Sequence, residues 1–113
     1  MSSCVFCKIL DKQAPAKIVH EDESCIAFHD LHPQAPVHLL VIPRKHFSST
    51  EEAAQTEEPV LGHLYRVAAK LARQYGITDG YRMVVNTGAG AGQTVFHFHL
   101  HVLGGRAFRW PPG

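Results

Sequence analysis

The sequence predicts an α+β domain built on an antiparallel five-stranded sheet, with one long helix and a short N-terminal helix. Only residues 57–75 have the length and apolar spacing of a long helix, whereas about five short segments have the composition of strands. The first strands follow one another directly, without the strand–helix alternation typical of a parallel sheet. A chain of 113 residues is the size of one domain, which we expect to span residues 1–113.

The first half of the chain supplies a short helix and three strands. Residues 4–12 are expected to form the helix, and residues 17–20 and 24–29 form two strands separated by an acidic turn at 21–23. Cys25 lies in the apolar part of the second strand and is expected in the core. After the break at Pro33 to Pro36, the almost continuous apolar run 37–42 predicts a buried central strand that includes His38.

The second half supplies the long helix, a glycine-rich loop and two further strands. The apolar residues of the helix form one stripe, which predicts core packing: Val60, Leu61, Leu64, Val67, Ala68, Leu71, Ala72 and Tyr75. Residues 81–86 and 95–103 are expected to be strands. The loop between them, 87–94, contains three glycines, which can aim several backbone N–H groups at an anion.

Composition excludes several classes of function. The formal charge is +1, too small for a protein that binds nucleic acid through a basic surface. No apolar run approaches the roughly 20 residues of a membrane span, and the first residues do not have the pattern of a signal peptide. Three cysteines without such a signal predict reduced thiols and a cytoplasmic protein. The pair Cys4-x-x-Cys7 indicates metal binding or thiol redox chemistry.

Three alternating histidines, His97, His99 and His101, are the most informative feature of the sequence. Alternate residues of a strand share one face, so we expect the three side chains to converge on one phosphate or one metal. Phe98, with its apolar neighbours, would then face the core. The glycine-rich loop leads directly into this segment, and Gln93 and Thr94 add side-chain donors. The loop and the histidines together predict a phosphate site.

The segment His97-Phe98-His99-Leu100-His101-Val102-Leu103 resembles the signature of the histidine-triad superfamily, in which histidines alternate with apolar residues. The resemblance extends along the chain and is closest to the Hint branch, the histidine-triad nucleotide-binding proteins or nucleoside phosphoramidases. It is carried by Phe28-His29-Asp30, Pro33-Gln34-Ala35-Pro36, residues 38–46, Asn86-x-Gly88, Gly92-Gln93-Thr94, Gly104-Gly105-Arg106 and Trp110-Pro111-Pro112-Gly113.

The resemblance implies hydrolysis of the P–N bond in purine nucleoside 5′-phosphoramidates, such as those of AMP or GMP, by a homodimer with a ten-stranded sheet. It implies that His99 is the nucleophile and forms a nucleotidyl-histidine intermediate, and that His101, His38 and Thr94 assist it. No cofactor is required for this chemistry. The implied nucleotide-binding residues are Phe6, Ile9, Phe28, Asp30, Leu31, Asn86, Gly92, Gln93, Thr94, His99 and His101.

Some members of the superfamily pair such cysteines with two histidines in a structural zinc site. The positions that match here are Cys4, Cys7, His46 and His97, two thiolates and two imidazoles. Because related proteins without the cysteine pair are active, this zinc would stabilise the fold and leave catalysis to other residues.

Several alternatives remain open at this stage. The enzyme could hydrolyse dinucleoside polyphosphates or transfer a nucleotidyl group, or the chain could be a non-catalytic nucleotide-binding scaffold. The three histidines could also hold a catalytic zinc, although the outer pair would lie roughly 13 Å apart on an extended strand. A redox role for the cysteine pair is not supported, since no thioredoxin-like βαβ pattern accompanies it.

Overall fold

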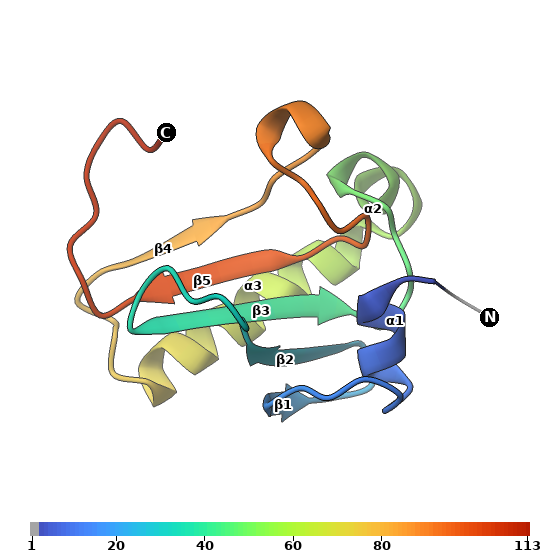
Figure 1. Cartoon of the computed structure of the whole chain (residues 1–113), viewed down its shortest axis with the longest axis horizontal. Helices are drawn as coiled ribbons and strands as arrows, with labels where there is room; N and C mark the ends of the chain where they lie inside the picture. The colour runs from blue at the N-terminus through green and yellow to red at the C-terminus, as the bar shows by residue number, and fades with distance from the viewer. Residues whose placement is uncertain (1–2) are drawn as a thin grey trace.

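The computed structural model describes residues 3–113 and contains one five-stranded antiparallel sheet, which confirms the predicted fold class. The strands lie in the order β1-β2-β3-β5-β4 (Figure 1). Their bounds are Ile18–Glu21 for β1, Cys25–His29 for β2, Val37–Pro43 for β3, Tyr81–Val84 for β4 and Leu100–Gly104 for β5. The central position of β3 explains its apolar sequence, because a strand with neighbours on both sides is buried along its length.

One face of the sheet packs against the long helix α3, Glu58–Gln74, which lies behind the sheet in Figure 1. The apolar stripe of α3 is buried against alternate residues of the strands, as its spacing predicts. The central members of this core are Cys25, Ala27, Leu39, Val41, Leu64, Leu71, Phe98, Leu100 and Val102, all 3% exposed or less. Cys25 and Phe98 therefore lie in the core, as expected.

The opposite face carries a smaller apolar cluster under the short helix α1, Val5–Leu10. Phe6 and Ile9 of this helix pack on the other set of alternate strand residues, which are Ile26, Phe28, Leu40 and Ile42. His38 and His101 belong to the same face, because each lies one residue away from a residue that packs against α3. Strand alternation therefore places polar catalytic candidates beside a minor apolar cluster and away from the main core.

The single helix expected over residues 57–75 is preceded by a second helix, α2, Thr50–Thr56. The hydroxyl of Ser49 accepts the backbone N–H of Glu51 at 3.2 Å and caps α2. The helix was missed because only Ala53 of its seven residues is buried, so it has no apolar stripe. Pro59 at the start of α3 separates the two helices.

The last strand is shorter than expected. Strand pairing begins at Leu100, so residues 95–99 of the expected strand 95–103 are not in the sheet. The backbone N–H of Phe98 instead donates to the carbonyl of Phe47 at 2.6 Å. The glycine-rich loop contains a 3₁₀ turn, Ala89–Ala91, that ends at Gly92 with a φ of 94°. Within the described residues, no helix has both the length and the apolar character to cross a membrane.

Candidate functional site

The three alternating histidines divide into two groups. The rings of His99 and His101 lie together, with centroids 5.0 Å apart, and line one cavity. The ring of His97 turns toward the N-terminal segment, where its Nδ1 lies 3.6 Å from the sulfur atoms of Cys4 and Cys7. The expectation that all three converge on one site is therefore wrong. The physical reason is that strand pairing begins only at Leu100, and that Nε2 of His97 donates to the carbonyl of Pro43, which leaves its Nδ1 facing the cysteines.

The hydrogen bond of His99 fixes which of its nitrogens can act as a nucleophile. Nδ1 lies 2.7 Å from the backbone carbonyl oxygen of His97, and a carbonyl can only accept. The proton of neutral His99 is thus on Nδ1, and Nε2 carries the lone pair. His99 is 8% exposed and lines the cavity, so this lone pair is sheltered and still available to a bound molecule.

A second chain of hydrogen bonds fixes the proton of His101. The backbone N–H of Gln34 donates to Nδ1 of His38 at 3.0 Å, so His38 carries its proton on Nε2. That Nε2 lies 2.9 Å from Nδ1 of His101, which must therefore accept. Neutral His101 then carries its proton on Nε2. At the cavity, His99 thus presents a lone pair on Nε2, and His101 presents an N–H group on Nε2.

Burial favours the neutral forms of these rings. Desolvation is the main cause that lowers the pKa of His101 to about 4; the neighbouring rings of His99 and His38 act in the same direction, and Asp30 opposes them. Desolvation also lowers the pKa of His38, with Asp30 opposing. At neutral pH both rings are uncharged, as the chain of hydrogen bonds from Gln34 requires.

The cavity has a volume of 280 Å³ and combines apolar walls with the two histidines. Eight of the predicted nucleotide-binding residues line it: Phe6, Ile9, Phe28, Asp30, Leu31, Thr94, His99 and His101. A second cavity of 560 Å³ shares Pro15, Ala16, His29, Asp30 and Leu31 with it, so the two adjoin, and we refer to them together as the groove. An apolar slot that opens onto polar groups suits an aromatic base joined to a sugar phosphate.

Asp30 lies where the groove meets the histidines. Its Oδ1 accepts the backbone N–H of His32 at 2.8 Å, and its Oδ2 lies 3.4 Å from Nε2 of His38. Oδ2 is therefore the oxygen directed toward the site, and it can accept hydrogen bonds from hydroxyl groups of a ligand.

Three predicted residues, Asn86, Gly92 and Gln93, do not line this cavity. The expectation that the Gln93 side chain donates to a ligand is wrong, because its amide is used within the protein. Its Nε2 donates to the carbonyls of Ser48 at 2.7 Å and Val95 at 3.1 Å, and its Oε1 accepts the N–H of Gly88 at 2.8 Å. Gln93 therefore holds the glycine-rich loop in place through these bonds, and the loop places Thr94 at the cavity.

Sequence reasoning missed several lining residues, including Val5, Pro15, Ala16, His32, Leu40 and Val95. Leu40 could have been found from strand alternation, since it lies two residues after His38 on β3. Pro15 and Ala16 follow α1 in an irregular segment, for which the sequence carries no comparable signal.

The second cluster joins Cys4, Cys7, His46 and His97, whose ligand atoms all lie within 4.8 Å of one another. The Nδ1 atoms of His46 and His97 are 3.1 Å apart, and Cys7 Sγ is 3.3 Å from Nδ1 of His46. In a tetrahedral zinc site, bonds of about 2.3 Å to sulfur and about 2.05 Å to nitrogen place two nitrogens about 3.3 Å apart, and a sulfur and a nitrogen about 3.5 Å apart. The four donors fit that arrangement.

His97 is prepared to be a ligand through Nδ1. Its Nε2 donates to the carbonyl of Pro43 at 2.9 Å, which leaves the Nδ1 lone pair directed at the cluster. Burial lowers the pKa of His97 to about 4, although the Pro43 carbonyl opposes this. Since a metal binds only the neutral imidazole, this environment favours a metal ligand.

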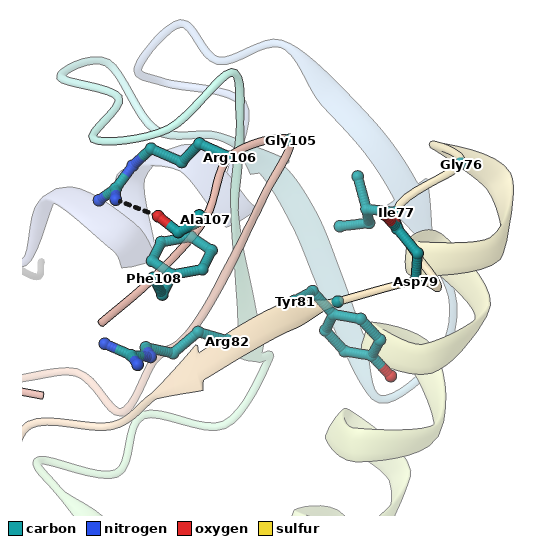
Figure 2. Close-up of a pocket in the computed structure, with 10 residues that line it drawn as sticks. Gly76, Ile77, Asp79, Tyr81, Arg82, Gly105, Arg106, Ala107 and Phe108 are labelled. Carbon is teal, nitrogen blue, oxygen red and sulfur yellow. Dashed lines mark hydrogen bonds between the residues drawn. The ribbon is translucent and has the colours of Figure 1, made fainter. Parts of the chain in front are cut away.

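A further cavity of 760 Å³ lies at the far end of β5 and is lined by ten residues, none of them histidine. Figure 2 shows Arg82 and Arg106 on either side of the Phe108 ring, with guanidinium carbons 5.1 and 4.3 Å from its centroid. Both guanidinium groups also donate to backbone carbonyls, Arg82 to Arg109 and Arg106 to Gln34 and Ala107. These contacts anchor the C-terminal segment against the sheet, and the lining of this cavity includes none of the three triad histidines.

Comparison with known proteins gives a consistent result. Residues 11–108 match the model of the HIT domain family. The chain is 50% identical over 109 residues to an uncharacterised HIT-like protein of Synechococcus elongatus, covering 96% of each. Among solved structures it is similar to a HIT family hydrolase from Legionella pneumophila, with a TM-score of 0.94, 46% identity and coverage of 98% and 100%. A histidine triad nucleotide-binding protein from Candida albicans has a TM-score of 0.84, 28% identity and coverage of 96% and 83%.

Proposed function

The chain belongs to the HIT domain family and has the fold of its hydrolases, and from this premise we propose that it cleaves the P–N bond of purine nucleoside 5′-phosphoramidates. The observation that carries the proposal is the proton arrangement, with a lone pair on His99 Nε2 beside an N–H on His101 Nε2. The apolar slot above this pair suits a purine, and Asp30 suits the ribose hydroxyls. The name of the Candida albicans protein agrees with nucleotide binding.

In the first step His99 Nε2 attacks the phosphorus, and the P–N bond breaks as the new N–P bond forms. The leaving nitrogen must first gain a proton from solvent, which the hydroxyl of Thr94, an exposed residue of the cavity wall, relays, so that it departs as a neutral amine. His101 donates its Nε2 hydrogen to a phosphoryl oxygen and stabilises the charge there. The carbonyl of His97 stabilises the positive charge that His99 acquires.

In the second step water attacks the phosphorus of the nucleotidyl-histidine, and the P–N bond to His99 breaks. One proton of the water stays on the phosphate and the other returns to solvent, so His99 regains its starting form with the proton on Nδ1. The net reaction is phosphoramidate plus water giving nucleoside monophosphate plus amine. No step passes through a metal.

The test is the rate at which adenosine 5′-phosphoramidate releases AMP. We expect turnover by the native protein and loss of at least about 10³-fold in His99→Ala, with AMP still bound by the variant. His63→Ala is a matched control, because His63 lies on α3 across the sheet. Near-native turnover by His99→Ala would contradict the proposed nucleophile. AMP binding without turnover by the native protein would favour a scaffold, and faster cleavage of a diadenosine polyphosphate would move the substrate class within the family.

We further propose that Cys4, Cys7, His46 and His97 hold a structural zinc ion. Bound zinc would add a cross-link among the N-terminal segment, the loop after β3 and the segment before β5. Metal analysis after expression in zinc-supplemented medium is expected to give about one ion per chain, and Cys4→Ser combined with Cys7→Ser is expected to lose it. An unchanged metal content in this double variant would contradict the ligand set. Reduced thiols of this kind agree with a cytoplasmic location.

We also propose a homodimer joined at a sheet edge. Strand β4 is an edge strand, and Met83 on it is 36% exposed and Trp110 after the sheet is 82% exposed. Pairing two such edges would produce a ten-stranded sheet and cover apolar surface. Light scattering is expected to give twice the 12.5 kDa chain mass; a monomer at micromolar concentration would contradict the proposal.

A further inference from the structure

The four-residue cluster and the base slot lie on two sides of the same short helix. We propose that metal binding to the cluster locks α1 over the slot and thereby sets the affinity of the protein for the base of a nucleotide. The metal would then control substrate binding as well as the fold. This inference rests on the proposed function and on the proposed zinc site.

Helix α1 is too short to be stable without contacts to the rest of the protein. It has six residues, Val5–Leu10, whereas isolated helices below about 12–15 residues are marginal in water. Cys4 is its N-cap residue, and its side chain does not make the hydrogen bond of a typical N-cap. The hydrogen bonds that close its other end are local, from Gln13 N–H and Ala14 N–H to the Lys8 carbonyl. Its position therefore depends on tertiary contacts.

Residue spacing divides the helix between two tasks. Cys4 and Cys7, three residues apart, reach the cluster with His46 and His97. Phe6 and Ile9, also three residues apart, reach the cavity that contains His99. Residues three apart lie on one side of a helix, so each pair acts as a unit. Two of the four proposed metal ligands thus come from the element that supplies two walls of the slot.

Phe6 provides the contact between the helix and the reacting groups. Its ring meets the ring of His99 edge-on at 5.1 Å between centroids, and that of Phe28 at 5.6 Å. It also meets the ring of the proposed ligand His97 at 5.8 Å. Phe6 is 6% exposed. If α1 moved away, the slot would lose Phe6 and Ile9 together, while the hydrogen bonds of His99, His101 and His38 would remain.

The other ties of this segment are weaker than a metal cross-link. The ion pair of Lys12 with Glu21, 2.9 Å long, joins the segment after α1 to β1, but both side chains are about half exposed. Exposed pairs of this kind contribute at most about 1 kcal/mol. The apolar contacts of Phe6 and Ile9 with the sheet, and the contacts of Cys4 and Cys7 with the two histidines, remain when the cluster holds no metal, so a metal would add to contacts that already dock α1.

The experiment compares two ligands with and without metal. AMP and ribose 5-phosphate share the phosphate and the sugar, but only AMP has a base. We expect zinc removal by a chelator to weaken AMP binding about 10-fold, equivalent to about 1.4 kcal/mol, and to change ribose 5-phosphate binding by less than about 2-fold. Hydrogen exchange of residues 5–10 is expected to accelerate in parallel, while exchange in β3 stays slow.

Variants separate the lock from other effects of the metal. Cys4→Ser with Cys7→Ser is expected to reproduce the chelator result. Phe6→Ala is expected to weaken AMP binding while zinc stays bound, and Lys8→Ala, at an exposed position of α1, is expected to change neither. Equal AMP affinity of the zinc-loaded and zinc-free proteins, or equal loss for both ligands, would overturn the inference. If the zinc-loaded protein fails to bind AMP at all, the proposed function fails instead.

Discussion

Nε2 of His38 lies 2.9 Å from Nδ1 of His101, and this contact determines where the proton of His101 resides. The two residues lie on neighbouring strands, because β3 and β5 pair with Leu40 opposite His101. This chain of hydrogen bonds begins at the backbone N–H of Gln34, which can only donate. A main-chain donor thus sets the tautomers of two rings in series, the buried ring of His38 and the partly buried ring of His101.

Replacement of His38 by leucine removes the donor that His101 Nδ1 requires. We expect kcat for the phosphoramidate to fall on the order of 10²-fold, the usual size of one positioned proton donor. The AMP dissociation constant is expected to change less than kcat, because His38 lines the adjoining 560 Å³ cavity but not the 280 Å³ slot that holds His99 and His101. Ring nitrogen-15 shifts report the cause directly: His101 is expected to lose its single Nε2–H tautomer. Retention of that tautomer together with full kcat would contradict the proposed relay.

The sequence predicts the sheet and its core well because their signals are local and periodic. The apolar run 37–42 is buried from His38 onward, as predicted, and the stripe of residues 57–75 packs against the sheet. Sequence patterns do not identify an element correctly where few of its residues are buried or where its backbone is irregular. Helix α2 buries only Ala53, and the segment 95–99 looks like a strand but is held by the loop carbonyl of Phe47.

The candidate site divides in the same way. The resemblance implies that His99 and His101 act at the nucleotide site and that His97 joins the cysteines. In the structure His99 and His101 line the cavity, and His97 lies in the cluster with Cys4 and Cys7. The resemblance does not reveal the tautomers, which depend on the carbonyl of His97 and the N–H of Gln34. Backbone groups are the same in every residue, so no side-chain pattern can encode which of them meets a given ring. The same reason explains why the internal bonds of Gln93 were not foreseen.

Gln93 offers a test of how the glycine-rich loop is held. Its buried amide makes three hydrogen bonds to the backbone of Gly88, Ser48 and Val95. Replacement by leucine leaves these groups without their partner, and we expect a loss of about 1–3 kcal/mol in unfolding free energy. Urea unfolding measures this directly. Because the loop presents Thr94, kcat is expected to fall as well. A stability within 0.5 kcal/mol of native, roughly that of a neutral surface change, would show that the loop does not depend on Gln93.

A polar cluster on the other face of the sheet offers an independent test of stability. Oδ2 of Asp22 accepts Nε2 of His20 at 2.7 Å and Nε2 of His63 at 2.8 Å, which links the β1–β2 turn to α3. Oδ1 accepts the N–H groups of Ser24 and Cys25. Desolvation raises the pKa of Asp22, but the bonds from His20 and His63, together with the two backbone bonds, hold it far below its ordinary value.

We expect Asp22→Asn to lower the unfolding free energy by about 1–3 kcal/mol at pH 7. The amide that replaces one carboxylate oxygen brings its own N–H groups toward the donors of His20 and His63. Glu23→Gln is the matched control, since Glu23 is exposed in the same turn. Turnover is expected to stay native, because the cluster does not line the cavity. Equal stability of the two variants would show that the link to α3 contributes nothing.

The lowered pKa of His101 predicts the direction of a pH effect on stability. The pKa is about 4 in the folded protein, against an ordinary value near 6.5 in the unfolded chain. Between these values the unfolded chain binds more protons, so unfolding becomes easier as the pH falls from about 6.5 to about 4. The loss of unfolding free energy is complete below the pKa of His101 in the folded protein, and it is absent above the pKa of His101 in the unfolded chain. Its size is on the order of 3 kcal/mol, reduced by the partial exposure of the ring.

His101→Gln removes this titration and is therefore expected to flatten the decline in stability on acidification. Zinc release at low pH would produce a decline of its own, so both proteins are compared in the Cys4→Ser, Cys7→Ser background, where the proposed site is absent in each. All other titratable groups, including His97, are then present in both proteins. The one further difference is that His38 loses its hydrogen-bond partner when His101 is replaced. Urea unfolding at pH 7, 5.5 and 4.5 gives the three points needed. Parallel stability curves would mean that His101 is protonated equally easily in the folded and unfolded chains, and the argument from burial would be wrong.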